Sequence, residues 1–260
     1  MNVEKTIGFI GGGRVTRILL KGFENRNIVF SEITVSDVNA EALNSLQKTF
    51  LGIRLAPNDN RAPAGSEIVF LALHPPAIPA VLEDIGSSLK AETVLVSLAP
   101  KITIARLAAA LKGFPRVARM IPNACSIVNA GYNPLVFGGG IGAAEQERLR
   151  ELFGAFGECP EVKEETLEAY AILTAMGPTY FWPQWIELEN LAGSFGLGPE
   201  DARPALARML EGSVRTLFSS GLSAEEVLDL IPVKPLDEHQ TAIKEMYRTN
   251  LTALFNKLKS

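Results

Sequence analysis

The stretch from Lys5 to Leu20, K-T-I-G-F-I-G-G-G-R-V-T-R-I-L-L, decides the fold of this chain. An apolar run from Thr6 to Ile10 stops at three successive glycines, and apolar residues then recur with the spacing of a helix. These helically spaced residues are Val15, Ile18, Leu19 and Phe23. The order of strand, glycine turn and helix is the arrangement that holds the diphosphate of a dinucleotide at a helix N-terminus.

The glycines match the dinucleotide fingerprint G-x-G-x-x-G in its first two places. Gly11 and Gly13 take these places, where a missing Cβ lets the chain turn tightly and lets a diphosphate approach the backbone. Thr16 takes the third place, where Gly or Ala is usual, and it leaves less room for the helix to pack on the strand. The pattern alone is weak evidence, because glycines are common in turns.

An acidic residue strengthens this interpretation. A second apolar strand, 33–36, ends in Asp37, about 20 residues beyond Thr16, where an acid reaches the adenosine ribose of a bound dinucleotide. A carboxylate there accepts hydrogen bonds from the ribose hydroxyls and repels a 2′-phosphate, so the expected cofactor is NAD or NADP, with NAD slightly favoured. The alternative is that Asp37 only caps a helix beginning near Ala40.

Composition limits the partners. The chain has 260 residues, 47% of them hydrophobic, and a net charge of −4 with both signs interleaved. This balance predicts a packed protein that binds a small molecule and neither nucleic acid nor a membrane. With no apolar leader or bilayer-length apolar segment, we expect a cytoplasmic location. Cys125 and Cys159 lack the spacing of a disulfide framework or a metal site, so no metal is expected.

Apolar runs predict a doubly wound, Rossmann-type parallel sheet. The strands are expected at 6–10, 33–36, 52–55, 68–73, 93–98 and 117–121, and the helices between and after them at 40–50, 77–89, 102–111 and 143–156. Ligands bind such sheets at the carboxyl ends of the strands. His74, Lys101 and Asn123 follow three of these strands and are therefore expected at the cofactor edge. The alternatives are that His74 is a solvated loop histidine and Lys101 a surface lysine without a catalytic role.

Beyond Gly157 the pattern becomes helical. Helical periodicity covers 165–175, 179–195, 200–219 and 242–258. One helix carries a wide apolar stripe made of Leu206, Met209, Leu210, Val214, Leu217 and Phe218. We therefore expect two domains, a dinucleotide-binding domain at 1–157 and an all-helical domain at 158–260 whose helices form a homodimer.

Several motifs resemble those of the pyrroline-5-carboxylate reductase family, whose members reduce a cyclic imine to proline with NADPH or NADH in proline biosynthesis. The similar stretches are I-G-F-I-G-G-G from Ile7 on, F-L-A-L-H-P at 70–75, V-S-L-A-P-K-I-T at 96–103, R-M-I-P-N at 119–123 and T-A-M-G-P-T-Y at 174–180. They extend over most of the chain and are more specific together than the fingerprint alone.

The resemblance implies a Rossmann domain followed by a helical dimerisation domain, with the substrate held between them. The implied cofactor positions, apart from Asp37, are Gly11, Gly13, Arg14, Val15, Leu73, His74, Pro75, Ala99 and Asn123. The implied substrate side comprises Thr174, Gly177, Pro178 and Tyr180. Tyr180 or Thr174 is the candidate to orient a proton path. The alternatives are that Tyr180 is an interface aromatic and Thr174 a helix-end hydroxyl.

The chain also departs from the family pattern. Pro100 and Lys101 replace an Ala-Gly pair that lies near the nicotinamide in the family, and Met176 replaces a serine. The family's carboxylate-binding S-P-G-G-T-T segment corresponds here to V-K-P-L-D-E-H, 233–239. If this chain binds a carboxylate, Lys234 could supply a point charge in place of the lost donors.

The sequence thus favours an NAD(P)H-dependent reductase of a cyclic imine. Two alternatives stay open: reduction of a different small imine or carbonyl, and a nucleotide-binding regulatory protein that has lost turnover. No Walker lysine follows the glycine turn, and no serine has a histidine and an acid at a recognisable spacing, so kinase and hydrolase chemistry find no support.

Overall fold

The computed structural model describes residues 2–259, which form two compact units. The first unit comprises the residues up to Met176 together with those from Leu254 onward, and the second unit is Gly177–Ala253. The division falls after Met176, later than the boundary expected after Gly157. The reason is that Leu167 and Ala171 are buried against Ile121 in a small apolar cluster of the first unit.

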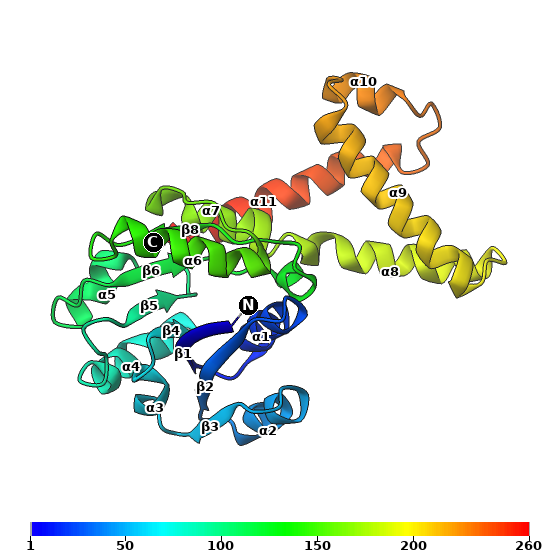
Figure 1. The fold of residues 1–260 in the computed structure, drawn as a ribbon. Helices are drawn as coiled ribbons and strands as arrows, with labels where there is room; N and C mark the ends of the chain where they lie inside the picture. Colours follow the sequence, from blue (N-terminus) through cyan, green and yellow to red (C-terminus); the bar gives the residue numbers. More distant parts are fainter. Residues whose placement is uncertain (1, 260) are drawn as a thin grey trace. The chain divides into compact units, whose positions relative to one another are not determined.

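A seven-stranded sheet forms the centre of the first unit, in the order β3-β2-β1-β4-β5-β6-β8 (Figure 1). The strands are β1 (Asn2–Ile10), β2 (Val29–Asp37), β3 (Arg54–Pro57), β4 (Ile68–Leu71), β5 (Val94–Ser97), β6 (Val117–Met120) and β8 (Leu135–Phe137). Neighbouring strands are parallel from β3 to β6, and β8 is antiparallel to β6. The expected Rossmann-type sheet is confirmed.

Helices cover both faces of this sheet. They are α1 (Arg14–Asn25), α2 (Ala40–Thr49), α3 (Arg61–Ala64), α4 (Ile78–Ile85), α5 (Ile104–Ala110), α6 (Ala143–Phe153) and α7 (Leu167–Tyr170). Ile68 and Phe70 of β4 are buried in one cluster with residues of α1, α2 and α6. Val69 and Leu71 are buried in a second cluster with residues of α4 and α5. The alternation explains why this strand is apolar at every position.

Several details differ from the sequence-based expectation: β2 begins at Val29 and not at residue 33, and the antiparallel strand β8 was not predicted. β3 begins at Arg54 and not at Gly52, because Gly52 has a φ of +87° and belongs to a turn. The single-turn helix α3 was not expected. Two-residue strands β7 (Gly131–Tyr132) and β9 (Gly157–Glu158) pair in a small second sheet, and neither is long enough to leave a periodic pattern.

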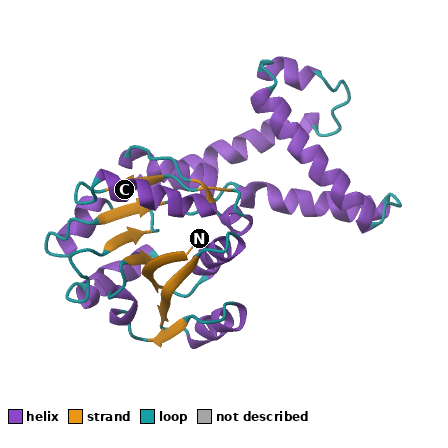
Figure 2. Ribbon diagram, in the orientation of Figure 1, coloured by secondary structure: helices purple, strands orange, loops and turns teal. Residues whose placement is uncertain are grey.

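The second unit is all-helical (Figure 2). It contains α8 (Pro178–Ser194), α9 (Pro199–Ser219), α10 (Ala224–Asp229) and the larger part of α11 (Gln240–Lys259). Its side chains are unusually exposed: between 177 and 253 only Gly177, Ala192 and Ala202 are buried. A unit of this size therefore lacks an apolar core of its own within the described chain.

Candidate functional site

The glycine turn after β1 lies directly against the turn after β4. Gly11 has a φ of +104°, and a Cβ on it would lie 2.3 Å from the carbonyl oxygen of Ala72. The Gly11 amide donates to the Ser36 carbonyl at 2.8 Å, and the Ala72 amide donates to the Ile10 carbonyl at 2.8 Å. Both the left-handed conformation and the close approach require glycine at this position.

Thr16 occupies the third fingerprint position without disrupting the turn. Its side chain is fully buried, and its hydroxyl donates to the Gly11 carbonyl at 2.5 Å. The hydroxyl therefore satisfies a buried backbone acceptor of the turn itself. This hydrogen bond accommodates a threonine in the place where Gly or Ala is usual.

The N-terminus of α1 is open to a ligand. Gly13 is the N-cap of α1, no side chain caps the helix, and a Cβ on Gly13 would meet nothing within 4 Å. A hollow of about 190 Å³ beside it is lined by Gly12, Gly13, Arg14, Arg17, Ala42, Ser45 and Leu46. Arg14 and Arg17 are exposed, and within the described chain neither has a salt-bridge partner. Free amides, the helix dipole and two guanidinium groups together fit the diphosphate of a dinucleotide.

Asp37 connects the end of β2 to the glycine turn. One carboxylate oxygen accepts from the Gly12 amide at 2.6 Å, and the other accepts from the Asn39 amide at 2.8 Å. Asn39 is the residue that caps α2, since its side chain accepts from the amides of Glu41 and Ala42. The alternative interpretation of Asp37 as a helix cap is therefore wrong, and its carboxylate lies beside the turn.

The predicted residues after β4, β5 and β6 lie at the same edge, because these strands are parallel to β1. Leu73 is half-buried, His74 is exposed and precedes a short 3-10 helix that begins at Pro75, and Ala99 is buried. Val15 is half-buried and packs against the main apolar cluster. Together with Gly11 and Asp37, these residues extend across the edge from β2 to β5.

Asn123 is buried, and its polar atoms have partners within the protein. Its amide donates to Asn133 Oδ1 at 2.7 Å, its Oδ1 accepts from the Cys125 amide at 2.8 Å, and its Nδ2 donates to the Thr174 carbonyl at 2.5 Å. These contacts make Asn123 a structural link between the end of β6 and residue 174. Its cofactor-binding role stays a prediction.

A buried ion-pair group that the sequence did not reveal lies under the loop after β5. The guanidinium of Arg119 donates to Glu164 at 3.0 Å and to Glu168 at 2.8 Å. Burial raises the pKa of the Glu168 carboxyl, but hydrogen bonds from Arg119 and from the Lys101 amide lower it by more, so the pKa lies below its ordinary value. The R-M-I-P-N motif includes Arg119, whereas the two acids resemble ordinary helix-surface residues in the sequence.

The predicted substrate-side residues are divided between the two units. Thr174 belongs to the first unit, and its hydroxyl donates to the Tyr170 carbonyl at 2.8 Å. Gly177, Pro178 and Tyr180 belong to the second unit at the start of α8, and Lys234 is exposed in a loop of the same unit.

Tyr180 lies in an aromatic group of the second unit. Its ring packs edge-on against Tyr247, with 5.8 Å between centroids. Burial and then the neighbouring Tyr247 raise the pKa of the Tyr180 phenol. The phenol is therefore protonated at neutral pH.

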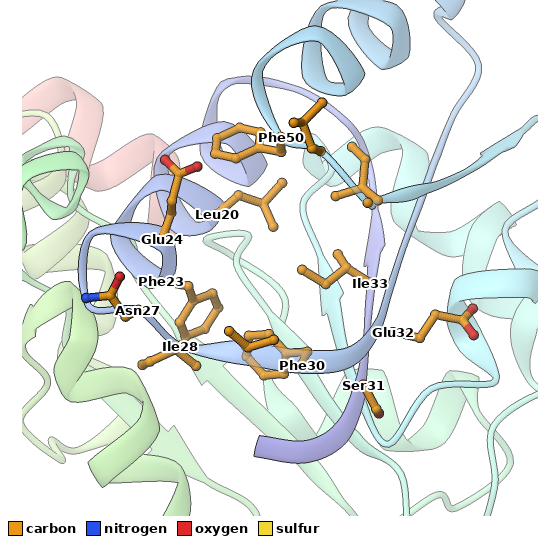
Figure 3. A pocket seen from close by; sticks show the side chains of 14 residues that line it. Leu20, Phe23, Glu24, Asn27, Ile28, Phe30, Ser31, Glu32, Ile33 and Phe50 are labelled. Carbon is orange, nitrogen blue, oxygen red and sulfur yellow. The ribbon is translucent and has the colours of Figure 1, made fainter. Parts of the chain in front are cut away.

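A separate cavity of about 410 Å³ lies between the ends of α1 and α2 and the start of β2, where Leu20, Phe23, Phe30 and Phe50 surround it (Figure 3). It is at the amino end of β2, whereas the glycine turn and Asp37 are at the carboxyl ends of the strands. This cavity is therefore not part of the candidate dinucleotide site.

Neither cysteine has the properties of a nucleophile. Burial raises the pKa of the Cys125 thiol, and it raises that of Cys159 to about 12. Among residues 2–259 no group of three or more His, Cys, Asp or Glu side chains is arranged to hold a metal ion. Within the same range, no helix combines the length and apolarity required to cross a bilayer.

Comparisons with known proteins agree with this geometry. Residues 6–101 match the family described as NADP oxidoreductase, coenzyme F420-dependent. Human pyrroline-5-carboxylate reductase 2 is 27% identical over 221 residues, covering 83% of this chain and 68% of the human protein. The pyrroline-5-carboxylate reductase of Pseudomonas aeruginosa is 27% identical over 250 residues, covering 95% of this chain and 90% of that protein.

A solved structure has the same fold. The crystal structure of Plasmodium falciparum pyrroline carboxylate reductase with NADP bound superposes with a TM-score of 0.82 at 19% identity, covering 98% of each chain. This structure confirms the expected fold, and the curated relatives confirm the resemblance predicted from the sequence motifs.

Substituting Gly13 tests the anion site at the start of α1. We expect Gly13→Val to weaken NADH and NADPH binding at least tenfold, because a branched side chain would lie where the diphosphate passes. The variant should fold normally, since the space around its Cβ is empty. Isothermal titration of the full chain with each dinucleotide measures the effect.

Gly142→Val is the matched control, because Gly142 is also an uncapped N-cap glycine with nothing within 4 Å of its Cβ. We expect this variant to bind dinucleotide like the unmodified chain. Affinity unchanged within twofold in Gly13→Val would contradict the assignment of the site.

Proposed function

We infer that the chain belongs to the pyrroline-5-carboxylate reductase family, and we propose that it reduces the carbon–nitrogen double bond of a small cyclic imine with NADH or NADPH. The observation that carries the proposal is the uncapped glycine turn joined to Asp37. The motifs at 70–75, 96–103, 119–123 and 174–180 support it, because they extend the resemblance through both units. With 1-pyrroline-5-carboxylate as the imine, this reaction is a step of proline biosynthesis.

The residues of this chain bind and orient the reactants. The amides at the start of α1, with Arg14 and Arg17, would hold the diphosphate, and Asp37 would bind the adenosine ribose. Leu73, His74, Pro75 and Ala99 would border the other half of the dinucleotide. The bound dihydronicotinamide supplies the hydride, so the protein needs only to position the imine, protect it from water and allow its protonation.

On the substrate side we propose Tyr180 or Thr174 as the group that orients the proton path. The raised pKa keeps the Tyr180 phenol protonated, as a hydrogen-bond donor must be. Thr174 already donates its hydroxyl to Tyr170, so it would act as an acceptor. Gly177, Pro178 and the exposed Lys234 complete the proposed substrate side, with Lys234 offering a charge to a carboxylate.

Turnover of the full chain tests the reaction. We expect oxidation of NADH or NADPH and formation of proline when 1-pyrroline-5-carboxylate is added, and neither in Gly13→Val. Oxidation only with another cyclic imine or a carbonyl compound would indicate the different substrate that the altered 233–239 segment allows. Tight dinucleotide binding without turnover on any of these substrates would favour the regulatory alternative.

Asp37 is proposed to make NADH the preferred cofactor. We expect Asp37→Ser to weaken NADH binding about tenfold, since a charged hydrogen bond of about 1.5 kcal/mol is lost, and to improve NADPH binding relative to NADH. Asp37→Asn, which keeps an acceptor for the Gly12 amide but removes the charge, should shift the ratio in the same direction. If the ratio of the two dissociation constants moves in neither variant, Asp37 does not select the cofactor.

We also propose that the second unit forms a homodimer. Large apolar side chains are exposed on its helices, including Ile186, Phe195, Val214 and Phe218, which are 60%, 77%, 57% and 78% exposed. A hollow of about 350 Å³ between α8 and α9 is lined largely by apolar residues, Trp182, Trp185 and Leu206 among them. A second copy would bury the surface that this unit cannot bury alone. A cytoplasmic location stays a prediction.

A charged residue on this surface tests the dimer. We expect Ile186→Asp to shift the protein from dimer to monomer in sedimentation velocity, because the carboxylate would be buried in the interface. Leu51→Asp, at a 94% exposed position of the first unit, is the matched control and should stay dimeric. A monomeric unmodified chain, or a dimer unaffected by Ile186→Asp, would refute this interface.

A further inference from the structure

Two carboxylates, the buried Glu168 and the partly buried Glu164, hold the backbone of the loop between β5 and α5 and of the first residue of α5. The Lys101 amide donates to Glu168 Oε1 at 3.0 Å, and the Ile104 amide donates to Glu164 Oε1 at 2.7 Å. Arg119 pairs with the same two acids, and its side chain is only 1% exposed. We name Arg119, Glu164 and Glu168 the Arg119 clasp. The clasp fixes one backbone position in the loop and one at the start of α5 by charge-assisted hydrogen bonds.

The loop has an unfavourable conformation where Glu168 holds it. Lys101 has a φ of +76°, in the left-handed region that residues with a Cβ rarely adopt. Without a partner for its amide, a lysine there would relax toward a negative φ. The hydrogen bond to Glu168 therefore stabilises Lys101 in a strained backbone conformation. The same conformation would not be strained for a glycine.

This loop lies on the side of the site where the nicotinamide half of a dinucleotide is expected, away from Asp37. Asp37 lies at the end of β2, so the adenosine end of a dinucleotide belongs to the β1 and β2 side of the sheet. β5 lies beyond β4 on the other side, and the loop that follows it includes the buried Ala99. A displacement of Lys101 would move the backbone that borders the nicotinamide half.

We propose that Glu168 is a positioning residue that holds Lys101 in its left-handed conformation and so shapes the wall of the site beside the reactive ring. The proposal rests on the proposed function for its effect on turnover, but its structural part does not. A glycine at position 101 would adopt the left-handed conformation without help. Lys101 is held in it by the hydrogen bond to Glu168. The pair of Pro100 and Lys101 is thereby accommodated at this edge.

A set of variants at two positions separates positioning from plain stabilisation. Glu168→Ala removes the acceptor, and we expect amide hydrogen exchange at Lys101 to rise at least tenfold and NADH affinity to fall about fivefold. The double variant with Lys101→Gly should regain NADH affinity to within about twofold of the unmodified chain, because glycine adopts the left-handed conformation alone. Lys101→Gly alone is the reference for the double variant, and the two should bind NADH with the same affinity to within about twofold.

The matched control is Lys101→Ala combined with Glu168→Ala. It removes the same amine but keeps the Cβ, so we expect no recovery. If the alanine double variant recovers as well as the glycine one, the loss came from the lysine charge and not from the backbone, and the proposal fails. Unchanged exchange at Lys101 in Glu168→Ala would also overturn it, whether or not the chain turns over an imine.

Steady-state kinetics gives a second measurement. For an active enzyme we expect Glu168→Ala to lower kcat for the imine and the glycine double variant to restore it, which a loss of stability alone would not produce. Should Glu168→Ala fail to fold, Glu168→Gln keeps an acceptor for the Lys101 amide and weakens only the pairing with Arg119. That variant should then show slow exchange at Lys101, and fast exchange there would count against the positioning role.

Discussion

The contact between Gly11 and the Ala72 carbonyl is the constraint on which the first unit depends. A Cβ at position 11 would overlap that oxygen, so the turn after β1 can approach the turn after β4 only with glycine. This approach directs α1 across the sheet edge and leaves its first amides unpaired by any side chain. Thr16, Asp37 and Ser36 then hold the same turn through hydrogen bonds to its backbone. The position of α1 on the sheet and the open anion site at its start therefore both depend on this one packing contact.

Local patterns predicted most of the first unit. Strands buried on both faces give unbroken apolar runs, so β4, β5 and β6 were readily recognised, and with them the edge that carries Ala99 and Asn123. Elements that span only about one period, such as α3 and β7, leave no such pattern. The extension of the first unit to Met176 depends on the contact of Leu167 and Ala171 with Ile121, which no local pattern encodes.

Residues of the candidate site could be predicted only where their role depends on their spacing from other residues in the sequence. Gly11 and Gly13 follow from spacing, and Asp37 from its distance to them. Glu168 could not be found in this way, because its partners Arg119 and Lys101 are remote in the chain and its own segment resembles a solvated helix. Asn39, by contrast, accepts from the amides of Glu41 and Ala42, so the cap of α2 depends only on neighbours in sequence.

The path of α11 has a consequence for shortened forms of the protein. The helix begins in the second unit, yet its last residues belong to the first, where Leu258 packs beside Ile121 and Leu167. The second unit is thus an insertion and not an appendage, with a covalent connection at each of its ends. A fragment that stops at Met176 would expose the surface that Leu258 covers. Engineering an isolated nucleotide-binding module would therefore require grafting the final turn of α11 back onto it.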